Sequence, residues 1–191
     1  MQPRHGSDHA ELRYSTPART LHWIIAFGTF LQVAIGVTMA WRGHILAVWD
    51  SLTDFLFSTH KSLGFILLIL VLARIAVRRL YSPPPELPMP RWQLRAAAAN
   101  HCALYVLMLV VPLLGWLTAS FFPALQVFGT ISLPAITPPD RAVSDHLAIA
   151  HGLAALLLVG LIGLHLGAVL FHVLIRRDRV VYRMLPDRFG R

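Results

Sequence analysis

An all-α integral membrane four-helix bundle, with both termini in the cytoplasm, is the fold class that three features of the sequence predict. First, 56% of the 191 residues are hydrophobic and only 14% are charged, which departs from the composition of ordinary soluble domains. Second, the apolar residues gather in four blocks, and each block is long enough for a helix of about 20 residues that crosses a ~30 Å hydrocarbon layer. Third, the basic residues are concentrated on one side of these blocks.

The distribution of the 17 Lys and Arg residues predicts the topology. Most of them lie in the N-terminal tail, the second connection and the C-terminal tail: Arg4, Arg13, Arg19; Arg74, Arg78, Arg79, Arg91, Arg95; Arg176, Arg177, Arg179, Arg183, Arg188 and Arg191. Cytoplasmic loops carry the excess of Lys and Arg in membrane proteins, so both tails and the second connection are predicted to be cytoplasmic. The formal net charge of +8 is therefore attributed to topology, and no nucleic acid partner is expected.

The first two predicted spans differ in polarity. Residues 20–41 contain no charged side chain, and Trp23 and Trp41 lie near the two ends, where indole rings tend to sit at membrane interfaces. Residues 55–79 contain Lys61 and Arg74, and ionisable residues at membrane depth are costly enough to indicate a function. A Pro-rich stretch then ends the helix and is expected to form an extended cytoplasmic linker.

The third and fourth predicted spans are residues 96–121 and 146–175. Pro112 is expected to kink the third, and the Pro-rich connection after it is expected to lie over the outer mouth of the bundle. The fourth span is the most apolar, yet its stretch from Ile149 to Val173 contains three histidines. Together the four spans form one predicted domain, residues 1–191. Cys102 is its only cysteine, which excludes an intrachain disulfide and a thiolate metal cluster.

The histidines of the spans fall at matching depths. His151 and His165 are fourteen residues apart, which in an α-helix is a rise of about 21 Å and a rotation about 40° short of four full turns. The two side chains therefore share one face, near opposite sides of the membrane. His60 lies near the outer end of the second span, at the depth of His151, and His22 lies near the inner end of the first, at the depth of His165. The sequence thus predicts two histidine pairs, one in each leaflet.

Paired imidazoles from facing helices are the natural axial ligands of a low-spin haem iron, and they leave no open position for oxygen. A zinc site would require three or four ligands at one depth, whereas each depth offers two and the spans contain no acidic residue. We therefore predict two b-type haems stacked across the bilayer. His60 and His151 would bind the outer iron, and His22 and His165 would bind the inner one.

Other residues near these sites have two interpretations. Arg74, fourteen residues after His60, lies at the depth of the inner haem, where its guanidinium could pair with a propionate; alternatively it extends to the interface and serves topology. Four glycines either make room for a macrocycle or allow ordinary close packing of helices. They are Gly36, which faces the outer site because it follows His22 by fourteen residues, and Gly64, Gly152 and Gly167.

Seven segments in a fixed order carry a resemblance to a known family. They are TLHW from Thr20, THKSLG from Thr59, VLARIAVRRLYSPPP from Val71, NHCALYVLMLVVPLLGW from Asn100, AHG from Ala150, GLHLGAVLFH from Gly163 and the closing RMLP. With them the chain resembles the bacterial cytochrome b-561 family, and especially its members that act as superoxide oxidase. The resemblance covers nearly the whole chain, from about Ser15 to Pro186.

The resemblance implies the same four histidine ligands, a location in the bacterial inner membrane, and electron transfer from periplasmic superoxide to ubiquinone near the inner haem. Lys61, next to His60, would attract the superoxide anion, unless it pairs with a propionate or extends to the interface. Arg42 and Arg141 would widen the positive field, and nearby aspartates would oppose it. His101 and His172 would bind a quinone carbonyl or relay a proton, unless they are helix caps or propionate contacts.

Two other functions fit parts of this pattern. The chain could be the cytochrome subunit of a hydrogenase or dehydrogenase and receive electrons from a docked protein partner, although its short tails offer no long docking extension. It could also be a small transporter or membrane scaffold without haem. Haem reduction by superoxide would distinguish a superoxide oxidase from the first alternative. A haem assay would distinguish a cytochrome from the second.

Overall fold

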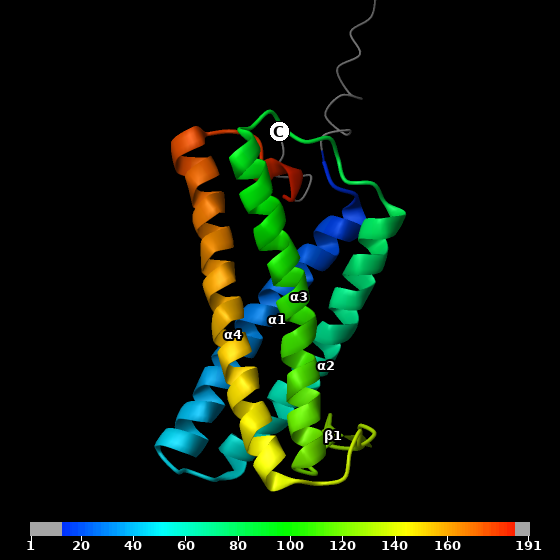
Figure 1. The fold of residues 1–191 in the computed structure, drawn as a ribbon, viewed down its shortest axis with the longest axis vertical. Coiled ribbons are helices and arrows are strands. Elements are labelled where there is room, and N and C mark those ends of the chain that lie inside the picture. The colour runs from blue at the N-terminus through cyan, green and yellow to red at the C-terminus, as the bar shows by residue number, and fades with distance from the viewer. Residues whose placement is uncertain (1–12, 186–191) are drawn as a thin grey trace, which may run out of the picture.

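Four long helices run the length of the computed structural model, which describes residues 13–185 (Figure 1). They are α1 (Thr16–Ala40), α2 (Ser51–Leu80), α3 (Arg91–Phe121) and α4 (Arg141–Leu170). The predominantly helical fold predicted from the sequence is confirmed. Three arginines used in the topology argument, Arg4, Arg188 and Arg191, lie outside the described residues.

The helix ends follow from local sequence. Asp50 precedes α2 and accepts a hydrogen bond from the Thr53 amide at 2.9 Å, and Asp140 does the same for α4 with the Val143 amide at 3.2 Å. These carboxylates satisfy amide groups that an α-helix leaves free at its start. At their C-terminal ends, α1 and α4 continue into π-helical turns, η1 (Trp41–Ile45) and η2 (Phe171–Arg176) respectively. A 3₁₀ turn, η3 (Val181–Arg183), follows η2. Each predicted span lies within one of these helices and its extension.

Three of the helical segments are long and apolar enough to cross a membrane: Thr16–Ile45, Arg91–Phe121 and Arg141–Arg176. Helix α2 is of similar length but carries charged residues within its apolar stretch. Large apolar side chains cover the outside of the bundle; Phe27 is 74% exposed and Leu156 is 68% exposed. A surface this apolar suits hydrocarbon and not water, so the molecule is a membrane protein.

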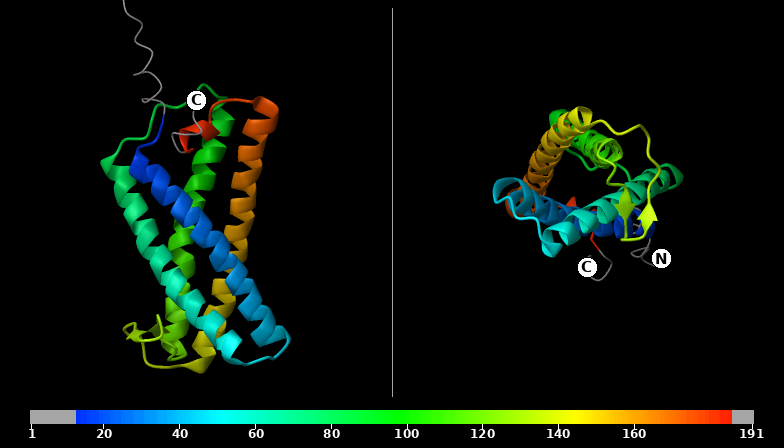
Figure 2. Two further views of the ribbon diagram at one scale, coloured as in Figure 1. Left: turned by 180° about the vertical axis from the view of Figure 1, so that it is seen from behind. Right: turned by 90° about the horizontal axis from the view of Figure 1, so that it is seen from below.

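The helices pack as two close pairs, α1 with α2 and α3 with α4, and α2 contacts α3 less extensively. Viewed along the bundle, the four helices surround a common axis (Figure 2). In residues 13–185 the deeply buried apolar side chains are few: Ile25, Leu67, Leu68, Val71, Val127 and Leu158. Protein interiors are normally packed to high density. The few buried apolar side chains fill only a small part of the space between the four helices.

The connection between α3 and α4 contains a small antiparallel hairpin, β1 (Gln126–Val127) and β2 (Ile131–Ser132), which corrects the purely α-helical expectation. It lies at the end of the bundle opposite the described chain ends (Figure 1). The Phe128 amide donates to the Ser62 hydroxyl at 2.7 Å, which holds the hairpin against α2. Helix α3 runs through Pro112 without interruption.

The two described chain ends are joined to each other. The Trp23 indole donates to the Met184 carbonyl at 2.8 Å, and the guanidinium groups of Arg13 and Arg19 donate to the Leu185 carbonyl at 2.8 and 2.9 Å. These bonds fasten the segment after α4 to the start of α1. Both ends of the described chain therefore lie at the same end of the bundle.

Candidate functional site

The outer histidine pair is brought together by α2 and α4. The ring centroids of His60 and His151 are 6.2 Å apart, and the ring planes are 84° from each other. The inner pair, His22 on α1 and His165 on α4, has almost the same geometry, with centroids 6.4 Å apart and an interplanar angle of 74°. The structure thus places the predicted partners ring to ring, at two levels of the bundle.

The ring separations suit a metal ion between each pair. An imidazole nitrogen binds a metal at about 2.0–2.1 Å, and the ring centre lies about 1.2 Å behind that nitrogen, so two imidazoles on opposite sides of one metal have centroids about 6.4 Å apart. In residues 13–185 no group of three or more His, Cys, Asp or Glu is arranged to hold a metal ion. Two-imidazole ligation, completed by a macrocycle, is the arrangement that the residues fit.

The orientation of the outer rings is set by their surroundings. The Nδ1 of His151 lies 2.9 Å from the Val111 carbonyl and therefore carries the proton that it donates, which leaves Nε2 as the nitrogen able to bind a metal. The Nδ1 of His60 is buried and has no hydrogen-bond partner in the described part of the chain. An unsatisfied buried nitrogen costs free energy, and a group bound to the His60 ring would offset that cost.

Two glycines make room for the outer rings. A Cβ atom at Gly36 would lie 2.9 Å from Cε1 of His60, and one at Gly115 would lie 3.3 Å from Cε1 of His151. Gly36 therefore faces the outer pair as predicted, and the group closest to it is the His60 ring. At Gly64 a Cβ would approach the Gln32 amide nitrogen at 3.1 Å, whereas at Gly152 and Gly167 it would meet nothing within 4 Å.

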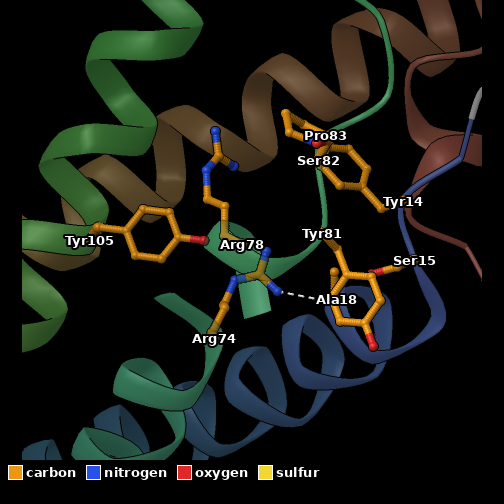
Figure 3. Close-up of a pocket in the computed structure, with 9 residues that line it drawn as sticks. All are labelled: Tyr14, Ser15, Ala18, Arg74, Arg78, Tyr81, Ser82, Pro83 and Tyr105. Atoms are coloured by element: carbon orange, nitrogen blue, oxygen red, sulfur yellow. Dashed lines mark hydrogen bonds between the residues drawn. The ribbon is translucent and has the colours of Figure 1, made fainter. Parts of the chain in front are cut away.

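Arg74 lies close to the inner pair, at the level that the spacing predicted. Its guanidinium donates to the Ala18 carbonyl at 2.7 Å, one helical turn before His22. The Cζ atoms of Arg74 and Arg78 each lie 6.0 Å from the centre of the Tyr105 ring. Figure 3 shows these three side chains converging on a small pocket whose other wall is formed by the start of α1 and the chain after α2. Neither guanidinium forms an ion pair with any residue in 13–185.

Of the two histidines predicted to serve a quinone, only His101 lies beside the inner pair. Its ring centroid is 5.4 Å from that of His165, and it lines an open cavity of ≈370 Å³ between α2 and α3. The other lining residues are Ile75, Arg78, Ala98, Cys102 and Tyr105.

His172 is held elsewhere, in η2. Its Nδ1 donates to the Asp178 carboxylate at 2.6 Å, and that carboxylate also accepts from the Val180 amide at 3.1 Å. Burial acts to raise the pKa of Asp178, but these hydrogen bonds and the nearby Arg176 outweigh it and lower the pKa below its usual value. Asp178 was not identified from the sequence, because a carboxylate in a short tail carries no spacing signal.

The cations near the outer pair are largely engaged. Arg42 pairs with Asp50 at 2.6 Å, and Arg141 pairs with Asp145 at 3.1 Å. Hydrogen bonds from Thr53 and Arg42 lower the pKa of Asp50 to about 2, so it stays ionised and cancels the Arg42 charge. The predicted widening of the positive field by these two arginines is therefore weakened. Lys61 donates to the neutral Ala124 carbonyl at 2.9 Å, so its charge is not cancelled by that contact.

Comparison with known proteins finds relatives that match nearly the whole length of the chain. A family model described as prokaryotic cytochrome b561 matches residues 13–187. The chain is 31% identical to cytochrome b561 homolog 1 of Escherichia coli K12 over 178 residues, which are 92% of this chain and 98% of that protein. It is also 31% identical to homolog 2 of the same organism over 176 residues, 91% of each chain. A probable superoxide oxidase of Yersinia pestis is 28% identical over 185 residues, 93% of this chain and 98% of that protein.

Proposed function

The chain belongs to the prokaryotic cytochrome b561 family and is a membrane electron-transfer cytochrome, and we propose that it carries single electrons from periplasmic superoxide, through two haems, to ubiquinone. The observation that carries this proposal is the pair of imidazole couples at two levels of one bundle, with centroid separations of 6.2 and 6.4 Å. The superoxide oxidase name of the Yersinia pestis relative supports the choice of donor. Membership of a cytochrome family disfavours a haem-free transporter or scaffold.

The proposed orientation places four helices across the bacterial inner membrane, with both termini in the cytoplasm. The location of both described chain ends at one end of the bundle supports an even number of crossings. The arginines near that end support its cytoplasmic side. In this orientation His60 and His151 lie in the outer leaflet and His22 and His165 in the inner leaflet.

Each bound haem b would supply a one-electron carrier at its own depth. The residues of the chain determine where those carriers sit. His60 with His151, and His22 with His165, would hold the two irons, and the Val111 carbonyl fixes the tautomer of His151. Arg74 reaches the level of the inner pair without an ion-pair partner among the described residues, as a propionate-binding arginine would.

The overall reaction balances in electrons and protons. Two superoxide anions lose one electron each and leave as two oxygen molecules, and one ubiquinone gains both electrons together with two protons from the cytoplasm. Lys61 would attract the anion at the outer end. At the inner end, His101 would donate a hydrogen bond or a proton to a quinone carbonyl. His172, held by Asp178, would pass protons from the cytoplasmic side.

Rapid mixing of the purified protein with superoxide is expected to reduce its haems promptly, and the rate should fall with added salt. Lys61→Ala is expected to lower that rate about tenfold, the low end of the range for electrostatic steering. Lys61→Arg keeps the positive charge but alters the contact with the Ala124 carbonyl. It therefore separates the effect of the charge from the effect of that contact. A rate of haem reduction that changes neither with salt nor in Lys61→Ala would show that Lys61 does not steer superoxide. Absence of haem reduction in the unmodified protein would favour the alternative of a cytochrome subunit fed by a dehydrogenase or hydrogenase.

Substitution of His101 or of His172 is expected to slow quinone reduction while the haem spectra remain intact. Loss of a positioned proton donor costs about 10²–10⁴-fold, so His101→Gln should reduce the quinone rate by about 10²-fold or more at neutral pH. His172→Gln, which removes a proton carrier outside the cavity, should reduce it by less. Glutamine retains a hydrogen-bonding group but cannot transfer the proton. Haem reduction by superoxide, measured without quinone, is the internal control. An unchanged rate of quinone reduction in either variant would show that the substituted histidine does not supply protons to the quinone.

A further inference from the structure

The cavity between α2 and α3 offers hydrogen-bond donors to a ligand that accepts them. Three of its lining side chains are polar: His101, Arg78 and Tyr105. Each can donate an N–H or O–H bond, and no carboxylate is among the described residues that line the cavity. Ile75, Ala98 and Cys102 form the apolar part of the wall. A neutral molecule with carbonyl oxygens and an apolar body fits this combination.

The cavity lies at the surface of the bundle, and His101 is the lining residue that places it next to the inner histidine pair. Its α3 residues, from Ala98 to Tyr105, follow the spacing of a single helix face, and His101 on that face is 5.4 Å from the His165 ring. His101, Ala98, Cys102 and Arg78 are all exposed, so the cavity that they line is open to the outside of the bundle. The ribbons of α2 and α3 diverge toward this end of the bundle (Figure 1). In a membrane this opening faces lipid.

We infer that ubiquinone enters sideways between α2 and α3 and that Arg78 and Tyr105, together with His101, bind its headgroup. The inference rests on the proposed function and adds the site, its entrance and two residues to it. The cavity volume of ≈370 Å³ lies within the range of about 300–1,000 Å³ of small-molecule sites. His172 does not line the cavity, so its role is limited to proton supply.

A quinone suits the cavity better than a phospholipid does. The polar atoms of a phospholipid remain at the interface, whereas His101 lies beside the inner imidazole pair and Tyr105 lies one helical turn deeper in α3. The Arg78 guanidinium lies 6.0 Å from the centre of the Tyr105 ring, so the two donors lie close enough together to serve one headgroup. Both side chains also line the neighbouring small pocket drawn in Figure 3, where Arg74 lies beside them.

Cys102 provides a direct measure of occupancy, because it is the only cysteine of the chain, is exposed and lines the cavity. The haem-loaded protein in lipid nanodiscs is treated with N-ethylmaleimide, with and without a short-chain ubiquinone, in the absence of superoxide. The rate of single-site alkylation is followed by intact mass. Ubiquinone is expected to slow alkylation, and Arg78→Ala and Tyr105→Phe should each raise the quinone concentration needed about tenfold, as loss of one hydrogen bond predicts.

Arg79→Ala is the matched control, because Arg79 is the neighbouring exposed arginine and does not line the cavity; its protection should equal that of the unmodified protein. A second control is an alcohol with the same side chain and no quinone ring. Equal protection by this alcohol would overturn the inference and identify the cavity as a lipid fissure. Normal quinone reduction with no protection of Cys102 would also overturn it, while the proposed function would stand. Failure of both protection and quinone reduction would reject the proposed function as well.

Discussion

Replacing His151 by alanine is expected to remove the outer haem and leave the inner one. The substitution deletes one of the two imidazoles whose rings lie 6.2 Å apart, and the remaining ring of His60 has a buried nitrogen without a partner in residues 13–185. The inner pair on α1 and α4 lies fourteen residues away along α4, about 21 Å, and keeps both of its rings. A pyridine haemochrome assay should therefore fall from two haems per chain to one, and electron transfer from superoxide to quinone should be lost.

His146→Ala is the control for this experiment. His146 lies on the same helix, is exposed, and bonds through Nδ1 to the Ala142 carbonyl of its own helix at 2.7 Å. Its loss should leave both haems and the electron transfer rate unchanged. If both absorption bands survived His151→Ala undiminished, the paired-imidazole arrangement would be wrong. A colourless unmodified protein would reject the haem proposal altogether.

The sequence predicted the helical fold and the pairing of histidines because both depend on strong periodic signals. Fourteen residues between two histidines determine a shared helix face whatever the rest of the fold does, and long apolar blocks leave little choice of secondary structure. His60 and His22 match the depths of His151 and His165 because they lie near opposite ends of their own spans. These predictions used geometry within single helices.

The features that the sequence did not reveal depend on contacts between helices. The Val111 carbonyl bonds to His151, and Gly115 faces the same ring, but no spacing along α3 indicates which of its faces meets α4. The cavity that adds Arg78 and Tyr105 to the proposed quinone site likewise depends on how far α2 and α3 diverge. Lys61 was predicted as a steering charge from its position next to His60, and its bond to the Ala124 carbonyl depends on the folding of a connection that has no periodic pattern.

Gly36→Ala is expected to weaken the outer haem site selectively. The added Cβ would lie 2.9 Å from Cε1 of His60 and 3.3 Å from its Nδ1, too close for an ordinary contact, so the ring must move relative to His151. Overpacking of this kind costs about 1–3 kcal/mol, which corresponds to a fall in outer haem affinity of about 5- to 150-fold. Haem content and the spectrum of the outer haem, measured during titration of the apoprotein with haem, should report the loss.

Gly160→Ala separates this steric effect from the general effect of replacing glycine in a helix. A Cβ at Gly160 would meet nothing within 4 Å, and alanine favours helix over glycine by about 1 kcal/mol at either position. The control should therefore bind two haems and unfold at the same or a higher temperature. If Gly36→Ala bound the outer haem as tightly as Gly160→Ala did, the His60 ring would not be confined by α1. The close approach of α1 to α2 would then have no part in positioning the ligand.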